Sequence, residues 1–397
     1  MQIARDVHWV GVLDPQLRIF DVIVQARWGT TYNSYLVVGQ EKVALIDTVK
    51  AGFEHSFFEK ISQVTGIDKI DYIVLNHLEP DHSGALGALL QKAPQARVVV
   101  SRNGAHFVRN LLNRELDLIT VGDGDSISLG GKTLQFISAP FLHWPDTMFT
   151  FLAEEGILFP CDAFGCHFCH EAIFDDLVGD FSQARKAYYD QIMRPFGEYV
   201  LKAYDKIKDL DIEMVAPSHG PVLRTDPRRY IDEYVTWSSA AKPGSTREIL
   251  VLYVSAYGNT EMMARAVVEG AVVPGVAASI INIAQFDPAE MLRRVDAADA
   301  IIIGSPTING DALKPVWDLL SGLATIKLKG KVGAAFGSYG WSGEAVKMIE
   351  ERLKGLKFSV VEPGVRAVLT PKEEALSQCR DLGRRVAEAV KAGVRGH

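Results

Sequence analysis

The chain has 397 residues but few cysteines, no excess of positive charge and no long apolar run. Four cysteines do not make a disulfide framework, so we expect thiols that are free, metal-bound or redox-active. The formal charge of −7 argues against a nucleic-acid partner. No segment reaches the length of a membrane helix, and residues 1–20 contain no apolar core of a secretory leader. We therefore expect a cytoplasmic protein with no membrane contact.

The length and composition indicate two domains. Hydrophobic residues make up 48% of the chain, which is enough for two cores. The one linker-like stretch is SSAAKPGSTR, which is small, polar and contains Pro243 and Gly244. We expect a first domain at 1–240, a linker at 241–247 and a second domain at 248–397.

The two halves differ in their apolar pattern. After the linker, apolar strands such as REILVLYVS and ADAIIIGSP alternate with amphipathic helices such as TEMMARAVVEGA, which predicts an α/β parallel sheet covered on both faces. Before the linker, strands come in runs, including KVALIDTV, DYIVLNH and DTMFTFLA, with fewer helices between them. That pattern predicts an α+β sandwich.

The segment NHLEPDHSG carries four metal-ligand side chains. It holds His77, Glu79, Asp81 and His82, between a strand that ends at Leu75 and a helix that we expect to begin near residue 83. A loop in that position is held by a rigid scaffold. Four such side chains within six residues cannot all face one ion, but they can divide between two ions.

Three further ligand-type residues follow apolar strands. His143 lies in APFLHWPD, Asp162 in GILFPCD and His219 in EMVAPSHG. A single histidine at a strand end is more often structural than a ligand. Together with the first segment, the three complete the ordered pattern H-x-E-x-D-H, H, D, H, which predicts a metal site with seven ligands.

This pattern resembles the metallo-β-lactamase superfamily, which implies an αββα sandwich with a dinuclear centre at one edge. Hydrolases of that superfamily usually carry His where this chain has Glu79. Glu79, Asp81 and Asp162 would give the site three carboxylates, and mixed histidine and oxygen ligands suit iron. We interpret Asp162 as the carboxylate between the two metals.

The segment CDAFGCHFCH contains Asp162 and also ends in C-x-x-C-H, the spacing of covalent haem attachment. Haem attachment normally follows export, and we see no export signal. A zinc clip or a redox dithiol would also fit this spacing. We expect Asp162 to be the functional residue here, with Cys161, Cys166, Cys169 and the two histidines as neighbours only.

Three loops of the second half follow strand ends. Residues 255–260 (SAYGNT) open a helix, and a loop with backbone N–H groups at a helix start can hold a phosphate. Neither G-x-x-x-x-G-K-[ST] nor G-x-G-x-x-G occurs at this position, which disfavours ATP and dinucleotides. Residues 305–311 (SPTINGD) and 337–343 (GSYGWSG) form the other two loops, and ligands of doubly wound sheets bind at such strand ends.

The three loops resemble those of flavodoxin, which binds FMN. The resemblance covers nearly all of residues 248–397. It implies an FMN site made of Ser255, Ala256, Tyr257, Gly258, Asn259, Thr260, Pro306, Thr307, Ile308, Asn309, Ser338, Tyr339, Gly340, Trp341 and Ser342.

A metallo-β-lactamase-like domain followed by a flavodoxin-like domain resembles the flavodiiron protein family, including the motifs HWPD, DAFG, PSHG, SPT and YGW. The resemblance implies reduction of O2 to water, of NO to N2O, or of both, by FMN and two non-haem irons. It also implies a head-to-tail homodimer, with a tetramer as an alternative. The ligands of one iron would be His77, Glu79 and His143, those of the other Asp81, His82 and His219, with Asp162 as the bridge.

The electron donor is expected to be a separate protein, because the chain has no paired C-x-x-C motifs and no nicotinamide fingerprint. We expect a rubredoxin-like donor, with reduced F420 as the alternative. One position departs from the family pattern, which often has His where this chain has Asp21, near the metals. This difference bears on proton supply and on the preference between O2 and NO.

Two other functions remain open from the sequence. One is a zinc-dependent hydrolase with a fused flavodoxin domain, which Glu79 disfavours. The other is a non-catalytic electron carrier or redox sensor that uses the flavin and the CHFCH segment. In that case the predicted metal ligands would be dispensable.

Overall fold

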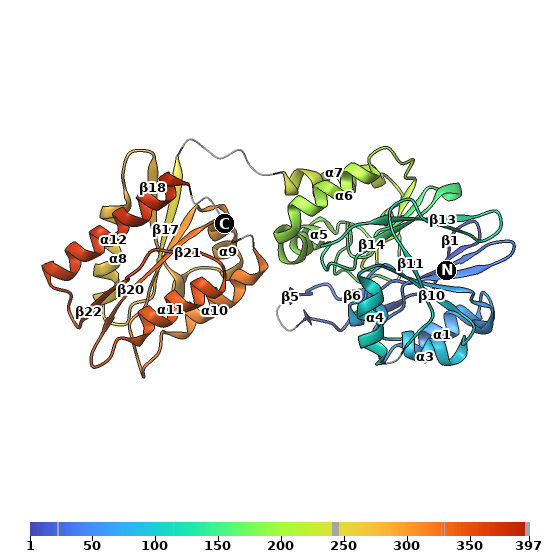
Figure 1. Ribbon diagram of the computed structural model, residues 1–397, viewed down its shortest axis with the longest axis horizontal. Coiled ribbons are helices and arrows are strands. Elements are labelled where there is room, and N and C mark those ends of the chain that lie inside the picture. The colour runs from blue at the N-terminus through green and yellow to red at the C-terminus, as the bar shows by residue number, and fades with distance from the viewer. Residues whose placement is uncertain (22–23, 114, 240–245, 327, 329, 394–397) are drawn as a thin grey trace. The chain divides into compact units, whose positions relative to one another are not determined.

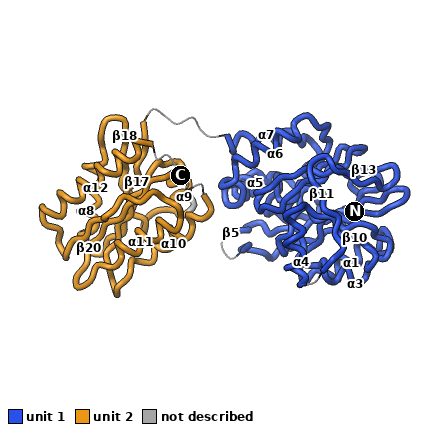
Figure 2. The backbone as a smooth tube through the Cα atoms, in the orientation of Figure 1, with its two compact units in different colours: residues 1–239 blue, residues 240–397 orange. Residues whose placement is uncertain are grey.

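The computed structural model describes residues 1–21, 24–113, 115–239, 246–326, 328 and 330–393. The chain forms two compact units, residues 1–239 and residues 240–397 (Figures 1 and 2). Most of the expected linker, residues 241–245, lies outside the described residues. Each unit is described by itself below.

The first sheet of unit 1 has seven strands in the order β1-β2-β7-β8-β9-β10-β11. Their bounds are β1 (Gln2–Ala4), β2 (Val7–Trp9), β7 (Tyr35–Val38), β8 (Val43–Ile46), β9 (Tyr72–Leu75), β10 (Arg97–Ser101) and β11 (Leu118–Val121). Pairing is antiparallel from β1 to β8 and parallel from β8 to β11. The carboxyl ends of β8, β9 and β10 therefore lie at one edge of this sheet.

The second sheet of unit 1 has five strands in the order β12-β13-β14-β15-β16. They are β12 (Ser126–Ser128), β13 (Thr133–Ser138), β14 (Met148–Leu152), β15 (Ile157–Phe159) and β16 (Met214–Val215). Two small ribbons accompany the sheets: β3 (Val12–Asp14) with β6 (Thr30–Tyr32), and β4 (Ile19–Phe20) with β5 (Val24–Gln25).

Three apolar clusters hold unit 1 together. One lies between the sheets, where Val74 and Val99 of the first sheet pack with Phe136 and Phe159 of the second. The helices of unit 1 are α1 (Glu54–Ser62), α2 (Pro80–Ser83), α3 (Leu86–Lys92), α4 (Gly104–Leu112), α5 (Ser182–Tyr188), α6 (Gly197–Ile207) and α7 (Pro227–Ser238). Helices α1, α3 and α4 share a cluster with the first sheet, and α5 to α7 share one with the second. The predicted αββα sandwich is confirmed.

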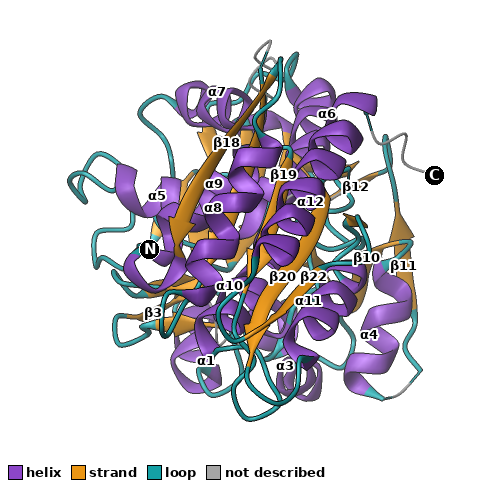
Figure 3. Cartoon of the chain, turned by 90° about the vertical axis from the view of Figure 1, so that its left-hand side faces the viewer, coloured by secondary structure: helices purple, strands orange, loops and turns teal. Residues whose placement is uncertain are grey.

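Unit 2 is a parallel sheet in the order β18-β17-β19-β20-β21, with β22 also paired to β20. Its strands are β17 (Arg247–Tyr253), β18 (Val276–Asn282), β19 (Ala300–Gly304), β20 (Val332–Tyr339), β21 (Ser359–Val360) and β22 (Val365–Val368). Its helices are α8 (Asn259–Ala271), α9 (Pro288–Ala297), α10 (Lys314–Gly322), α11 (Glu344–Gly355) and α12 (Glu373–Ala392), and Figure 3 shows them with the strands.

The central strands of unit 2 are apolar because helices cover both faces. Side chains of β17 alternate between the two sides: Leu250 packs with α9, α10 and α11, whereas Val251 packs with α8 and α12. The predicted doubly wound sheet is confirmed. Among the described residues, no helix is long and apolar enough to cross a membrane.

The structure corrects some predicted boundaries. The helix expected near residue 83 begins at Pro80, so Asp81 and His82 lie on a helical turn. Proline fits the first helical position because its φ is preset and its missing N–H has no partner there. Strand β18 ends at Asn282, and the chain continues as a 3-10 turn. Helix α10 and strand β22 were not predicted from the apolar pattern.

Candidate metal centre and phosphate-binding loops

All seven predicted metal ligands meet at one edge of unit 1. They come from four chain segments that follow strands β9, β13, β15 and β16. The distances divide them into two groups, which are His77, Glu79, His143 and Asp162, and Asp81, His82 and His219.

In the first group, the Oε2 atom of Glu79 lies 3.3 Å from the Nε2 atom of His77 and 3.0 Å from that of His143. The Oδ2 atom of Asp162 lies 3.7 Å from each of the same two nitrogens. Two donors about 2.1 Å from one ion lie about 3 to 3.7 Å apart when they bind at angles of about 90° to 125°. The four donor atoms are thus spaced as ligands of one ion.

In the second group, the Oδ1 atom of Asp81 lies 3.4 Å from the Nε2 atom of His82, and its Oδ2 atom lies 3.0 Å from the Nε2 atom of His219. The other oxygen of Asp162, Oδ1, lies 3.1 Å from His82 and 3.5 Å from His219. The two oxygens of Asp162 therefore face different groups, which is the geometry of a bridging carboxylate.

Three carboxylate oxygens of the centre are buried without a hydrogen-bond partner among the described residues. They are both oxygens of Asp81 and the Oδ2 atom of Asp162. Buried polar atoms are rarely left in that state, because burying one without a partner costs several kcal/mol, about 2 to 7. A cation between the two groups would satisfy these atoms, so the residues fit a metal centre.

The electrostatics also indicate a site for cations. Burial acts to lower the pKa of His82, but the carboxylates of Asp81 and Asp162 outweigh it and raise the pKa to about 9. Burial acts to raise the pKa of Asp162, yet the surrounding imidazoles, His82 foremost, hold it well below its usual value. Protons on the imidazoles balance the carboxylates in the metal-free protein, and metal ions would replace those protons.

Two outer contacts set the tautomers of the histidines, and sequence reasoning missed both. Asp146 Oδ2 lies 3.2 Å from His77 Nδ1 and accepts a hydrogen bond from the Leu78 backbone N–H at 2.8 Å. The Thr31 carbonyl lies 2.6 Å from His219 Nδ1. Each Nδ1 therefore donates, which leaves the Nε2 lone pair for a metal. The sequence signal for Asp146 is its place in the motif HWPD, three residues after His143.

Two further side chains near the centre were not predicted to act there. The Tyr188 hydroxyl donates a 2.9 Å hydrogen bond to Asp162 Oδ1. The ring of His167, 3% exposed, lies 4.9 Å from the rings of both Tyr188 and His219. Burial holds the pKa of His167 well below its usual value, so the ring is neutral. Neither residue could be found from spacing alone, because only the fold brings them to Asp162.

Asp21 stands at the solvent side of the centre. Burial and a hydrogen bond with Glu79 raise its pKa to about 6. Its backbone φ of 46° is in the left-handed region, which few residues other than glycine adopt. The structure thus places Asp21 beside a predicted metal ligand, as the resemblance implied.

The cysteines of CDAFGCHFCH are free thiols. The Cys161 thiol accepts a hydrogen bond from Ser218 at 3.2 Å and lies close to His82 and Asp162. Burial raises the pKa of Cys161 well above its usual range and that of Cys166 to about 12. Thiols with raised pKa values are poor nucleophiles, which disfavours a reactive Cys166/Cys169 dithiol. The burial of Cys166 also disfavours covalent haem attachment.

The three predicted loops of unit 2 lie at the carboxyl ends of β17, β19 and β20. Hydrogen bonds join them: Thr260 Oγ1 lies 2.9 Å from Ser338 Oγ, and the Thr307 N–H donates to the Ser338 carbonyl at 2.8 Å. Strand β20 continues to Tyr339, so the start of the third loop belongs to the strand.

Glycine is required where two of these strand ends approach. A Cβ atom on Gly337 would lie 2.1 Å from the Ser305 carbonyl oxygen, closer than any real contact. The backbone of the first loop turns at Gly258, where φ is 85°. The N-terminus of α8 follows directly, and the cap residue Gly258 provides no side-chain cap. The first backbone N–H groups of a helix suit a phosphate.

Two aromatic side chains stand exposed at the same loops. Tyr257 is 92% and Trp341 81% exposed, although rings of this size usually bury most of their surface. A flat apolar ring held between the loops would cover them. The loops and these two side chains therefore fit a flavin mononucleotide.

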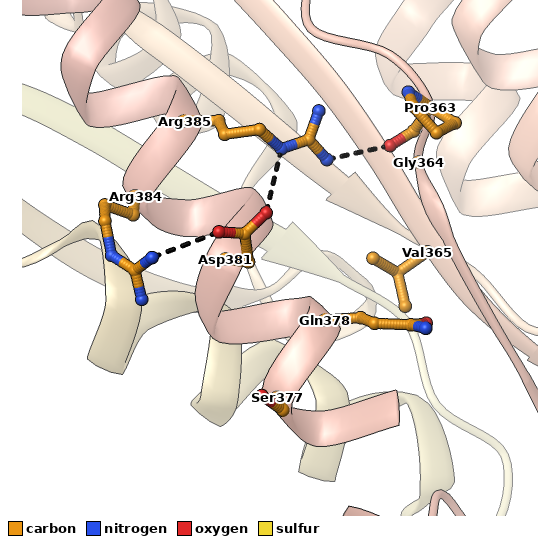
Figure 4. Close-up of a pocket in the computed structure, with 8 residues that line it drawn as sticks. All are labelled: Pro363, Gly364, Val365, Ser377, Gln378, Asp381, Arg384 and Arg385. Carbon is orange, nitrogen blue, oxygen red and sulfur yellow. Dashed lines mark hydrogen bonds and ion pairs between the residues drawn. The ribbon is translucent and has the colours of Figure 1, made fainter. Parts of the chain in front are cut away.

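Unit 2 has a hollow of about 600 Å³ between α12 and the segment that begins β22. Figure 4 shows that Asp381 pairs with both Arg384 and Arg385 there. Arg385 also donates to the carbonyls of Glu362 and Pro363. The two arginines thus share one carboxylate, and two backbone carbonyls hold Arg385 further.

The fold and the site together define a flavoprotein with a dinuclear metal centre. Comparison with known protein families and relatives gives the same class of protein. Residues 30–220 match the family model described as ODP family beta lactamase, and residues 251–383 match the model described as flavodoxin. The type A flavoprotein fprA of Rhodobacter capsulatus is 48% identical over 393 residues, 97% of this chain and 90% of the relative. The nitric oxide reductase of Moorella thermoacetica is 38% identical, covering 98% of each chain.

Among solved structures, the rubredoxin oxygen:oxidoreductase of Desulfovibrio gigas matches with a TM-score of 0.75 and 30% identity over 100% of both chains. The flavodiiron protein of Giardia intestinalis matches with a TM-score of 0.71 and 30% identity, covering 98% of this chain and 96% of that one. The chain belongs to the flavodiiron protein family, the type A flavoproteins. Its cofactors are FMN and a non-haem diiron centre.

Proposed function

We propose that this chain is an oxidoreductase that reduces O2 to water, NO to N2O, or both, with electrons that reach its diiron centre through FMN. The observation that carries the proposal is the division of the two Asp162 oxygens between two groups of buried ligands. One shared carboxylate holds two metals close enough to act on one small molecule. Relatives named as nitric oxide reductase and as rubredoxin oxygen:oxidoreductase support both substrates.

We propose the following ligands for the two irons. The first iron would be held by His77, Glu79 and His143, the second by Asp81, His82 and His219, and Asp162 would bridge them. The three carboxylates would balance three of the four positive charges of two divalent ions. A set of mixed carboxylate and histidine ligands favours iron, whereas zinc sites of this fold are richer in histidine. When bound, the irons supply open positions for the gas, Lewis-acid polarisation and redox electrons.

The side chains and backbone around the centre orient the metal ligands, leave one side accessible and place a carboxyl group there. Asp146 and the Thr31 carbonyl hold the imidazoles of His77 and His219 with Nε2 toward the metals. His143 is the most exposed of the seven ligands, with 17% of its side chain accessible, so small molecules would enter on its side. Asp21 stands at the solvent side next to Glu79, where a carboxyl group can pass protons from water toward the centre.

In unit 2 the three loops would hold FMN. The N–H groups at the start of α8, together with Ser255 and Thr260, would bind the phosphate. Tyr257 and Trp341 would cover the two faces of the ring. Reduced FMN carries two electrons, and O2 needs four to become water, so flavin and irons together can supply the full number.

The donor, the assembly and the location are further parts of the proposal. A rubredoxin-like protein is supported as donor by the name of the Desulfovibrio gigas structure.

We propose that the chain forms a head-to-tail homodimer. We also propose that it works in the cytoplasm, a location that the free cysteines of the chain favour. We also keep the proposed domains at 1–240 and 248–397 with a linker at 241–247. Light scattering tests the dimer, and limited proteolysis tests the linker.

Elemental analysis of protein expressed with added iron is the first experiment. About two irons per chain, followed by O2 or NO consumption with reduced rubredoxin, would support the proposal. About two zincs per chain, retained in spite of added iron, would contradict it and favour a hydrolase.

A further inference from the structure

His167 is enclosed by three rings next to the metal centre. Its ring centroid lies 4.7 Å from that of Phe20 and 4.9 Å from those of Tyr188 and His219. Tyr188 donates to the bridging Asp162, and His219 is a proposed iron ligand. The ring therefore stands in the wall of the site, on the side of the second group.

The contacts of Thr30 determine which nitrogen of His167 carries the proton. The Thr30 hydroxyl lies 3.0 Å from His167 Nδ1 and 3.3 Å from His219 Nδ1. His219 Nδ1 is a donor, because it lies 2.6 Å from the Thr31 carbonyl, and it can share its N–H with Thr30. The Thr31 carbonyl also lies 3.3 Å from Thr30 Oγ1, but it already accepts from His219 Nδ1 at 2.6 Å. The hydroxyl proton of Thr30 therefore goes to the nearer acceptor, His167 Nδ1, at 3.0 Å. An imidazole whose Nδ1 accepts a hydrogen bond carries its proton on Nε2.

That N–H has no acceptor in the described part of the chain. His167 Nε2 is buried and has no hydrogen-bond partner among the described residues. A buried donor without an acceptor is unfavourable, so natural proteins rarely keep one unless a ligand or water accepts from it. The neighbouring apolar wall, Phe20, offers no acceptor.

We propose that His167 Nε2–H donates a hydrogen bond to the small, electron-rich molecule that binds in the metal centre. Acceptors of this class are O2, NO and small anions such as azide. His167 would thus help to bind and orient the substrate of the proposed gas reductase, and this inference rests on that function. The geometry assigns Thr30 the supporting role of holding His167 in the Nε2–H tautomer.

The affinity of the oxidised, iron-loaded protein for azide tests the role of His167. The charge-transfer absorption of bound azide measures the binding, and the iron content of every sample is measured as well. His167→Phe removes the donor and keeps a flat ring, and we expect azide to bind about 10- to 100-fold more weakly. His167→Gln keeps an N–H donor and should restore most of the affinity. The exposed His170 provides the matched control, and His170→Phe should leave the affinity unchanged.

Thr30→Val is a second variant in case His167→Phe does not fold. It removes the hydroxyl that selects the tautomer, and we expect weaker azide binding with iron content retained. The KM for O2 should rise in the same variants more than kcat falls. Equal azide affinity of iron-loaded wild type and His167→Phe, or of wild type and Thr30→Val, would overturn the assignment of His167. Failure of the wild type to hold iron would instead overturn the proposed function.

Discussion

Asp146 Oδ2 lies 3.2 Å from the Nδ1 atom of His77, and both side chains are almost fully buried. Burial acts to lower the pKa of His77, but hydrogen bonds to Asp146 and Glu79 outweigh it and raise the pKa well above its usual value. The same Asp146 oxygen accepts from the Leu78 N–H, so the carboxylate is held by the backbone that carries His77. An outer carboxylate of this kind fixes the ligand's tautomer and strengthens its lone pair.

Asp146→Asn should weaken iron binding about 10- to 100-fold, because an amide orients His77 less firmly and does not add to its basicity. Competition with a chelator of known affinity measures the change. Asp123, an exposed carboxylate paired with Lys206, provides the control, and Asp123→Asn should bind iron as the wild type does. Equal affinity of the Asp146 variant and the control would contradict the role of Asp146.

Asp162→Ala and Glu79→Ala should differ in stoichiometry. Asp162 faces both groups, so its removal should deplete both irons. Among the other proposed ligands, the ion pairs of Glu79 are with His77 and His143 of the first group, so its removal should deplete mainly one iron. Elemental analysis combined with Mössbauer spectroscopy separates the two cases. Loss of both irons in each variant would show that the two groups bind metal only as a unit.

Metal affinity should rise with pH. In the metal-free protein the pKa of His82 is raised to about 9, so below that pH a metal must displace a proton from the second group. Acid therefore favours the free protein, and the apparent affinity should fall as pH decreases from about 9 to about 6. Chelator competition across this range measures the slope. His55 is exposed, and His55→Gln should leave the slope unchanged, whereas an affinity independent of pH would contradict the prediction.

Gly337→Ala and Gly355→Ala should have opposite effects on unit 2. The added methyl group at Gly337 would meet a carbonyl oxygen at 2.1 Å, so we expect a loss of about 2 to 3 kcal/mol in unfolding free energy and less FMN. At Gly355, in α11, no atom lies within 4 Å of the new methyl group, and alanine should stabilise the helix by about 0.5 to 1 kcal/mol. Thermal unfolding with flavin absorbance measures both.

Thiol reagents should modify Cys169 first. Cys161, Cys166 and Cys379 are buried, whereas Cys169 is only half-buried. Burial raises the pKa of Cys379 to about 12, as it does for Cys166, so neither should react at about pH 8 until the protein unfolds. Mass spectrometry after brief labelling gives the order. Cys169→Ser should retain iron and activity, and loss of either would revive a redox role for the CHFCH segment.

Much of the fold followed from local patterns. The alternation of apolar strands and helices after residue 247 predicted the parallel sheet of unit 2, because strands buried on both faces must be apolar throughout. Short elements were harder to predict: β22 and α2 have four residues each, too few for a periodic pattern to show. Pro80 determined where α2 begins, a local effect that the hydrophobic pattern does not record.

The sequence by itself determined the chemistry of the site, because ligand side chains at strand ends and glycine-rich loops are properties of short segments. It named His77, Glu79 and Asp162 as candidate ligands without any contact information. Only the tertiary structure decided that the two oxygens of Asp162 face different groups and that Tyr188 and His167 stand beside them. Those relationships join segments far apart in the chain, and such distances are set by how the two sheets pack, not by any local preference.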